Sequence, residues 1–418
     1  MLKVTKLNIY QTNKLKIFND PIYGFISIPK TIIFDLIEHP YFQRLRRISQ
    51  MGMSYLVYPG AHHSRFHHAT GCLYLMNKAV RVLRAKGVAI NSEEETGLYI
   101  AILLHDIGHG PFSHALEHSI VSNVSHEEIS LKFMEEFNTI FSGKLDLAIS
   151  IFKGQYSRVF FHQLVSSQLD IDRLDYLKRD SFYSGVAEGS INSDRLIAMM
   201  NVKDDALVIE EKGIYSIEKF IVARRLMYWQ VYLHKTGVVA ENMMVNVLKR
   251  AKELSLQGEK LLCSPSLEFF LSREIGLKEF DSKVLSVFAE LDDVDILSAL
   301  KMWKNNPDKV LSTLSSSLLD RKLLKIEMSK EAFDPNVQEE RRRFLANQWN
   351  LSEHEVGYFV FEGFVKNLAY NDIENKINLL MKDGSTMDFV KASDDVVAAR
   401  ISHETKKYFN VFPKELSF

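Results

Sequence analysis

Cysteine is scarce in this chain of 418 residues, which contains only Cys72 and Cys263. Two cysteines are too few for a disulfide framework or for a metal site built from thiolates. Such sparse use of cysteine is typical of a reducing compartment, so we expect a cytoplasmic protein.

An excess of charge of one sign is also missing, because 52 Lys and Arg residues stand against 53 Asp and Glu residues and the formal net charge is −1. This balance disfavours a general nucleic-acid binder, which carries a basic footprint, and suits a small anionic substrate. Arg341–Arg343 could contact a phosphate backbone, but a solvated helix face explains this run more simply. Nucleic acid is therefore a disfavoured partner.

Long apolar runs are absent as well. Residues 1–20 alternate lysines with apolar residues and lack a signal-peptide core, and no later run is long enough to span a bilayer. Repeats and low-complexity segments are not evident either. We therefore expect no membrane association.

The chain does contain strong helical periodicity. Apolar residues recur at helical spacing between Thr31 and Lys260, for example at Leu73, Met76 and Val80. This pattern predicts a mainly α-helical fold. The length exceeds the size at which one core keeps growing, so a second region is expected, and we place a boundary near residue 260. Residues 1–260 would form the core, and residues 261–418 a smaller mixed α+β region serving oligomerisation or regulation.

Three segments interrupt the helical pattern. Residues 206–217 have β-rich ends around Glu211-Lys212-Gly213, which predicts a small hairpin there. Residues 356–365 and 376–390 are strand-like, and the second of these carries Asp383-Gly384, a hairpin turn signal.

The segment from His105 to His114 concentrates three histidines and an aspartate directly after the apolar run Leu98–Leu104. The glycines and proline that follow predict that the helix ends here, where side chains can converge on one ion. Histidine and aspartate suit several divalent metals that activate water. A hydrogen-bonded loop is the plain alternative. His68, at the start of another predicted helix, could approach the same ion from a second direction.

A further ligand is suggested by Asp172, which precedes Tyr176 and Asp180 at i+4 and i+8. This spacing aligns the three side chains on one helix stripe. The stripe alone fits a solvated polar face better than a binding site, because charged helix faces are usually in contact with water. The spacing therefore leaves both interpretations open.

An ordered set of motifs resembles the HD-domain phosphohydrolases, and more closely their dNTP triphosphohydrolase branch, which includes the mammalian SAM-and-HD-domain protein and bacterial relatives. The resemblance covers roughly residues 16–250, and no segment looks like a SAM domain. The motifs lie at Phe18–Gly24, Phe42–Arg46, Tyr58–Ala61, Ser64–His68, His105–His114, His126-Glu127 and Asp172–Asp180.

The resemblance implies a role for each matching residue. A divalent metal, which could be Mn, Fe, Ni, Zn or Mg, would be held by His68, His105, Asp106 and Asp172. Catalysis at the phosphate path would involve His109, His114, His126 and Glu127, with His114 as general acid and Glu117 keeping it protonated. The substrate would contact Gln50, Arg65, Arg173, Tyr176, Asp180, Arg224, Tyr232 and Lys235.

The resemblance also implies a second nucleotide site, which would bind a dNTP or GTP activator. Its residues would be Lys16, Glu38, Gln43 and Arg46, completed by Arg321 and Lys325 from a neighbouring subunit. Two positions depart from the family pattern. Glu38 replaces an aspartate that reads the activator base, so guanine selectivity does not follow, and His67 replaces a glutamate beside the metal ligand. We expect a homo-oligomer, a tetramer or a dimer.

The implied reaction is hydrolysis of a dNTP at the α-phosphorus to a deoxynucleoside and inorganic triphosphate. Two alternatives stay open. Another HD-domain reaction, on a phosphodiester or a nucleoside monophosphate, would use the same metal with a different pocket. A nucleotide sensor would need no catalysis, although such a protein has little use for a full set of metal ligands.

Overall fold

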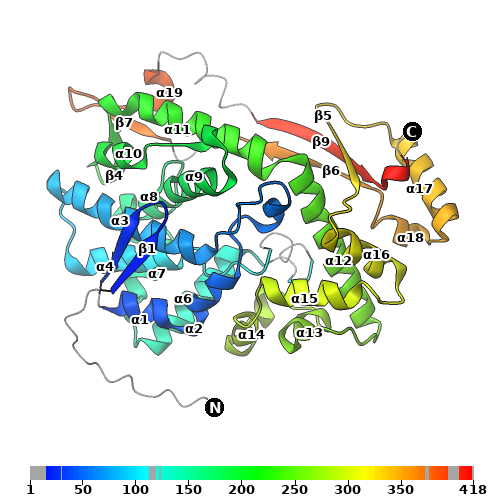
Figure 1. Cartoon of the computed structure of the whole chain (residues 1–418). Helices are drawn as coiled ribbons and strands as arrows, with labels where there is room; N and C mark the ends of the chain where they lie inside the picture. Colours follow the sequence, from blue (N-terminus) through cyan, green and yellow to red (C-terminus); the bar gives the residue numbers. More distant parts are fainter. Residues whose placement is uncertain are drawn as a thin grey trace.

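The helices predicted from apolar spacing dominate the computed structural model (Figure 1), which describes residues 16–29, 31–112, 119–121, 124–371, 376–393 and 404–416. Small sheets lie mainly in the C-terminal part of the chain. The predicted fold class, mainly α with a mixed α+β C-terminal region, is confirmed.

The first part of the chain begins with a β-hairpin and continues as helices. Its elements are β1 Lys16–Asp20, β2 Gly24–Ile28, α1 Ile32–Glu38, α2 Pro40–Gln43, η1 Arg44–Arg47, η2 Gly52–Leu56, α3 Arg65–Ala85, α4 Ser92–Leu104, α6 His126–Ile140, α7 Asp146–Phe152, α8 Val159–Val165, α9 Ile171–Ser184, η3 Ala187–Gly189, α10 Ser193–Met199, β3 Met200–Lys203, β4 Ala206–Glu210, η4 Glu211–Gly213, α11 Ile214–Met227, η5 Tyr228–Tyr232 and α12 Lys235–Leu256.

The remainder of the chain mixes helices and strands. Its elements are α13 Pro265–Leu271, η6 Leu277–Glu279, α14 Ser282–Phe288, α15 Asp293–Trp303, α16 Lys309–Leu319, β5 Lys325–Ser329, α17 Pro335–Trp349, α18 Glu353–Val356, β6 Phe361–Asn367, β7 Asn378–Leu380, β8 Thr386–Asp388, α19 Phe389–Ala392, β9 Thr405–Phe412 and η7 Lys414–Leu416.

Helix α4 lies at the centre of the first part. Asn91 and Glu94 form a capping box at its start, and every residue from Gly97 to Leu104 is buried. Helix α3 packs against both α4 and α9, and α7 covers another side of α4. A helix that is apolar all round must be enclosed in this way. The packing brings the start of α3, the end of α4 and the start of α9 to one place.

The hairpin predicted at residues 206–217 exists but lies earlier in the chain. Strand β4 pairs with β3, and the turn is Asp204-Asp205 rather than the predicted Glu211-Lys212-Gly213, which forms η4. Both aspartates have positive φ, +50° and +57°, the conformation that tight two-residue hairpin turns require. Aspartate tolerates this region better than most residues, a signal that the β-rich pattern obscured.

The C-terminal strands divide between two sheets. Strands β5, β9 and β6 form one antiparallel sheet in that order. Strands β7 and β8 form the predicted hairpin around Gly384 (φ +84°), and β7 continues the β3–β4 sheet by pairing parallel to β4. Figure 1 shows β7 and α19 beside α10 and α11, well away from β5, β6 and β9. The strand predicted at 356–365 begins later than expected, because helix α18 occupies 353–356. The observed strand, β6, covers residues 361–367.

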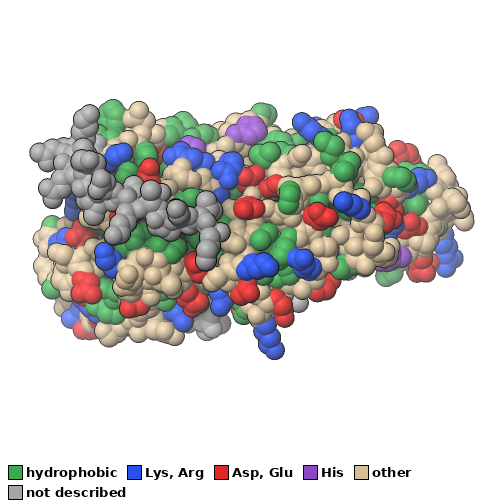
Figure 2. Space-filling model, turned by 90° about the horizontal axis from the view of Figure 1, so that it is seen from below, with side chains coloured by type: hydrophobic (Ala, Val, Ile, Leu, Met, Phe, Trp, Pro, Cys, Tyr) green, Lys and Arg blue, Asp and Glu red, His purple; other side chains and the backbone are tan. Residues whose placement is uncertain are grey.

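The boundary predicted near residue 260 follows α12, which packs against α13, α16 and β5. The division into two regions stays a prediction. Within the described residues, no helix combines the length and apolarity needed to cross a bilayer. On the face seen in Figure 2, acidic and basic side chains are interspersed rather than gathered by sign, in keeping with the near-neutral net charge.

Candidate metal centre and substrate cavity

The predicted metal ligands converge at the meeting point of α3, α4 and α9. His68 lies in the first turn of α3, His105 caps the end of α4 and is followed by Asp106, and Asp172 lies in the first turn of α9. His67 completes the start of α3, because its Nδ1 accepts from the backbone N–H of Ser64 at 3.2 Å. An N3 glutamate does the same in a capping box, so histidine can replace it here.

The ligand atoms are as close as a single ion requires. His68 Nε2 lies 3.3 Å from His105 Nε2 and 3.1 Å from an oxygen of Asp172. His105 Nε2 lies 3.5 Å from oxygens of both Asp106 and Asp172. Donors bound to one ion at about 2.0–2.2 Å stand roughly 3 to 3.5 Å apart. The donor set therefore fits a divalent cation.

The other ring nitrogens fix the orientation of both histidines. His105 Nδ1 lies 2.6 Å from the carbonyl oxygen of Ile102, and His68 Nδ1 lies 2.8 Å from Asp175 Oδ2. Since Nδ1 donates in each case, Nε2 is left as the acceptor that a metal needs. Partners of this kind hold the ligand ring and raise its basicity.

Asp175 belongs to a buried charge chain that sequence reasoning missed. Arg179 donates to both of its oxygens, at 2.9 and 3.0 Å, and also to Asp20 at the end of β1, at 2.8 Å. Burial alone would raise the pKa of Asp175, but Arg179 and His68 lower it to about 2. The carboxylate is therefore charged. The i, i+4 spacing of Asp175 and Arg179 was the available signal.

The electrostatics of the ligands also suit a cation. Burial opposes ionisation of Asp106, yet His105, His109 and Arg65 hold its pKa well below the usual range. His68 Nε2 lies 3.1 Å from an oxygen of Asp172 and 3.7 Å from one of Asp106, so two carboxylates face the same ring nitrogen. The carboxylates of Asp106 and Asp172 thus draw positive charge toward this point, which a divalent metal would supply.

Cys72 lies beside the ligands but differs from them chemically. Its Sγ is 3.7 Å from His68 Nε2, close enough to belong to the same cluster of metal-binding side chain types. Burial raises the pKa of its thiol far above the usual value, and thiolate is the form that binds metal. Cys72 therefore packs against His68 as a neutral thiol.

The loop that follows His105 is held by buried polar contacts. Arg44, fully buried, donates to the carbonyl of His109 at 2.8 and 2.9 Å and to that of Ile107 at 3.0 Å. Ser130 accepts from Gly108 N–H and donates to the carbonyl of His105, both at 2.8 Å. A Cβ on Gly108 would lie 2.3 Å from Ser130 N, so only glycine fits. These contacts fix the loop against α6 and η1.

The far end of this loop is held by α15. Asp293 accepts from Phe112 N–H at 3.1 Å with one oxygen and from Ser49 N–H at 2.8 Å with the other. Phe112 has φ +49°, a left-handed conformation that costs free energy in a non-glycine residue. Asp293 thus ties the metal-site loop to the segment that follows η1.

A cavity of about 550 Å³ opens beside the predicted metal ligands. That volume lies in the range of small-molecule sites. The described residues that line it do not include the predicted residues Glu127, Arg224 and Lys235, and His114 and Glu117 lie outside the described residues. The lining residues are Gln50, Met51, Gly52, Met53, Ser54, Arg65, Asp106, His109, Phe112, His126, Asp172, Arg173, Tyr176, Asp180, Tyr228, Tyr232, Leu233, Gly237 and Glu241.

Cationic and histidine side chains line the part of the cavity near the metal ligands. Arg65 pairs with Asp106, and Arg173 pairs with Asp170, the cap of α9. The rings of His109 and His126 stack at 3.8 Å. Burial and the charge of Arg65 lower the pKa of His109 to about 3, so its ring is neutral. This end offers hydrogen-bond donors and positive charge to an anion.

Tyrosines and one carboxylate line another part. The predicted substrate contacts Arg224, Tyr232 and Lys235 do not lie on one α-helix, because α11 ends at Met227 and η5 is a turn of π-helix. The wider turn carries Tyr228 and Tyr232, which line the cavity, whereas Lys235 is exposed and Arg224 donates to the carbonyl of Gln168 at 3.4 Å. Such π-helical turns often occur at functional sites.

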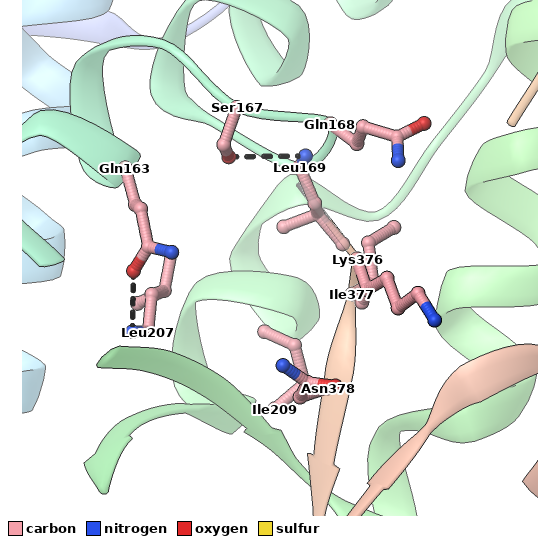
Figure 3. A pocket seen from close by; sticks show the side chains of 9 residues that line it. All are labelled: Gln163, Ser167, Gln168, Leu169, Leu207, Ile209, Lys376, Ile377 and Asn378. Carbon is pink, nitrogen blue, oxygen red and sulfur yellow. Dashed lines mark hydrogen bonds between the residues drawn. The ribbon is translucent and has the colours of Figure 1, made fainter. Parts of the chain in front are cut away.

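The loop before α9 is fastened by the C-terminal region. The side-chain amide of Gln168 pairs with the backbone of Asn371, whose N–H donates to Gln168 Oε1 at 2.7 Å. Figure 3 shows Gln168 beside a second, smaller cavity between this loop, Leu207 and Asn378. Its volume of about 20 Å³ holds no more than about a water molecule. The junction therefore positions α9 rather than binding a substrate.

Of the residues predicted for an activator site, Glu38, Gln43 and Arg46 lie close together, whereas the other three contact separate neighbours. Arg46 donates to Gln43 at 2.9 Å and lies 3.6 Å from the centre of the Phe66 ring, and burial lowers its pKa while Glu38 opposes this. The other residues contact different neighbours, since Lys16 lies over Phe34, Arg321 donates to the carbonyl of Leu56, and Lys325 pairs with Glu327.

Comparisons with known proteins agree with this geometry. Residues 65–153 match the HD domain, and residues 191–263 match the HD associated region. The uncharacterized protein YwfO of Bacillus subtilis is 32% identical over 97% of this chain and 95% of its own length. A crystal structure of a phosphohydrolase from Bacteroides thetaiotaomicron is 50% identical, with a TM-score of 0.93, and covers 96% of this chain and 100% of its own.

Another relative is named for its reaction. The deoxynucleoside triphosphate triphosphohydrolase SAMHD1 homolog of Dictyostelium discoideum is 32% identical over 268 residues. The match covers 59% of this chain and 51% of that protein, so the chain spans about half the length of this relative.

Proposed function

Because the chain belongs to the HD-domain phosphohydrolase family, we propose that it hydrolyses deoxynucleoside triphosphates to a deoxynucleoside and inorganic triphosphate. The observation that carries the proposal is one cavity that joins the metal ligands Asp106 and Asp172 to cationic groups and to Tyr176 and Asp180. These features suit, in turn, a phosphorus centre, a phosphate chain and a sugar.

A divalent metal held by His68, His105, Asp106 and Asp172 would supply Lewis-acid chemistry and activate water. Around it, Arg65 and Arg173 would neutralise phosphate oxygens as charge develops at the α-phosphorus. His109, neutral in the fold, can donate a hydrogen bond without adding charge. His126 and Glu127, at the start of α6, would complete this end. The leaving 5′ oxygen needs a proton, and His114, supported by Glu117, stays our prediction for its source.

At the sugar end, Gln50 and Asp180 would bind the sugar and Tyr176 would pack against it. Gln50 Oε1 is buried and has no hydrogen-bond partner among the described residues, as expected of a group that serves a ligand. Arg224 and Lys235 would reach the triphosphate only through side-chain movement, since neither lines the cavity as described.

The test measures products. The protein is incubated with each of the four dNTPs and with GTP, in the presence of Mn, Fe, Ni, Zn or Mg, and the products are separated by ion chromatography. We expect inorganic triphosphate and a deoxynucleoside. Orthophosphate would favour another HD-domain phosphatase or phosphodiesterase reaction, and binding without turnover would favour a nucleotide sensor.

Matched variants connect the activity to the site. Asp172→Asn keeps the shape of a ligand but removes its charge, and it should abolish turnover. Asp194→Asn removes an exposed carboxylate that pairs with Lys78, so it should leave turnover unchanged. Equal loss in both variants would contradict the proposed site.

We also propose activation by a dNTP or GTP through a homo-oligomer, a tetramer or a dimer. The proximity of Glu38, Gln43 and Arg46 supports a nucleotide site on the N-terminal segment. Arg321 and Lys325 of a neighbouring subunit, with Lys16, would complete it. Sedimentation with and without nucleotide tests this proposal, and a fully active monomer that does not respond would contradict it. The cytoplasmic location stays a prediction.

A further inference from the structure

His63 makes a buried contact with the substrate cavity that the motif resemblance did not include. It lies in the loop before α3, and its side chain is inaccessible to solvent. Its ring stacks on Tyr183 with centroids 4.4 Å apart, and its Nε2 lies 2.6 Å from Asp180 Oδ1. Asp180 lines the cavity. The side chain of His63 thus meets the cavity lining at Asp180, while its backbone carbonyl accepts from the N–H of Gln50, another lining residue, at 3.0 Å.

Both oxygens of Asp180 are held by protein donors. Tyr232 donates its hydroxyl to Oδ2 at 2.7 Å, while the ring of His63 contacts Oδ1. A carboxylate offers about four lone-pair directions, so two contacts leave acceptor capacity for a ligand. The carboxylate is thus fixed in direction while it still accepts a hydrogen bond from a hydroxyl in the cavity.

Packing alone does not account for a histidine here. His63 Nδ1 is buried and has no hydrogen-bond partner among the described residues. An unpaired buried polar atom is costly, and phenylalanine would stack on Tyr183 without that cost. The contact that distinguishes histidine from phenylalanine at this position is the one with Asp180.

We propose that His63 is a positioning residue that aims Asp180 at the 3′-hydroxyl of the nucleotide sugar. This inference rests on the proposed function. A deoxynucleoside 5′-triphosphate has one free sugar hydroxyl, at the 3′ position, and the carboxylate oxygens of Asp180 serve as hydrogen-bond acceptors. A sugar hydroxyl donating to Asp180 is therefore the 3′-hydroxyl. By holding the Asp180 carboxylate in place, His63 sets how strongly the protein prefers a nucleotide that carries this hydroxyl.

The experiment compares kcat/KM for a dNTP and for its 2′,3′-dideoxy counterpart, which lacks that hydroxyl. We expect the wild-type protein to prefer the dNTP by at least tenfold, on the order of one hydrogen bond to a charged group. His63→Phe keeps the ring stack but has no donor, and it should reduce the preference below about threefold with little change for the dideoxy substrate. His63→Gln places an amide donor near the Nε2 position and should restore most of it.

Two further variants complete the test. Asparagine places its amide near the Nδ1 position instead, so His63→Asn should show the same reduced preference for the dNTP as His63→Phe. It replaces His63→Phe in the test if that variant does not fold. His62→Phe changes the neighbouring exposed histidine and should keep the wild-type preference.

The outcomes separate the two claims. Wild-type preference retained in both His63→Phe and His63→Asn would overturn the role of His63, as would a wild-type protein that treats both substrates alike. A wild-type protein that releases no triphosphate from any dNTP would overturn the proposed function, and the role of His63 with it.

Discussion

Replacing Asp175 with asparagine tests how much a residue that holds a predicted metal ligand, but does not itself bind the metal, contributes to metal affinity. The substitution keeps the shape of the side chain but removes the charge that faces His68 Nδ1 at 2.8 Å and Arg179. Loss of such an outer partner typically weakens metal binding by 10 to 100-fold, which corresponds to about 1.4 to 2.7 kcal/mol. We expect Asp175→Asn to lose metal affinity in that range.

The stability of the protein should fall as well. Removing one partner of a fully buried pair costs about 3 to 5 kcal/mol, and we expect the lower end, because Arg179 keeps Asp20 at 2.8 Å. Competition with a chelator measures the metal affinity, and denaturant unfolding with excess chelator measures the metal-free stability. Asp194→Asn, at an exposed ion pair, is the control and should change stability by less than about 1 kcal/mol. Unchanged metal affinity in folded Asp175→Asn would refute the reasoning.

Three other perturbations have defined outcomes. A chelator should abolish turnover and lower the melting temperature, because metal at a hundred times its Kd stabilises the folded protein by about 2.7 kcal/mol. If the metal binds at this site, the chelator should lower the melting temperature of Asp172→Asn by less than that of the wild type. Burial lowers the pKa of His39, whose Nδ1 accepts from Tyr41 N–H, so its stability contribution is full above the unfolded-state pKa of 6.5 and declines below it. Asparagine caps a helix without titrating, so between about pH 7.5 and 5.5 the melting temperature of His39→Asn should fall less than that of the wild type, and parallel curves would contradict this. Arg44→Met should leave the carbonyls of Ile107 and His109 unpaired, which should destabilise the fold by about 1 to 3 kcal/mol for each carbonyl and lower kcat. Arg47→Met, at a half-exposed side chain, is the control and should leave kcat unchanged. Denaturant unfolding measures the stability and steady-state kinetics measure kcat.

The sequence predicted the features that local pattern determines. Helix periodicity located α3, α4 and α9, and the position of His105 at a helix end followed from the glycines after it. The predicted metal ligands lie at helix ends, but spacing alone left Asp172 open, and only the motif resemblance joined it to the other three.

Contacts between distant segments were beyond that reasoning. His63 meets Asp180 across 117 positions of chain, and nothing in its own neighbourhood indicates such a partner. The π-helical turn at Tyr228–Tyr232 is equally hidden, since its residues also fit ordinary helical spacing. The hairpin of β3 and β4 was misplaced because an Asp-Asp turn is a weaker signal than the glycine that follows β4.

The parallel pairing of β4 with β7 has a consequence for biosynthesis. Roughly 170 residues separate Glu210 from its partner Leu380, so the ribosome releases β4 long before β7 exists. At a translation rate of about 5 to 20 residues per second, one edge of β4 stays open for roughly 10 to 30 s. Open strand edges recruit other strands. The nascent chain therefore passes through an interval in which this edge of β4 has no strand beside it, and the loop before Asp172 gains its Asn371 contact only after 203 further positions have been synthesised.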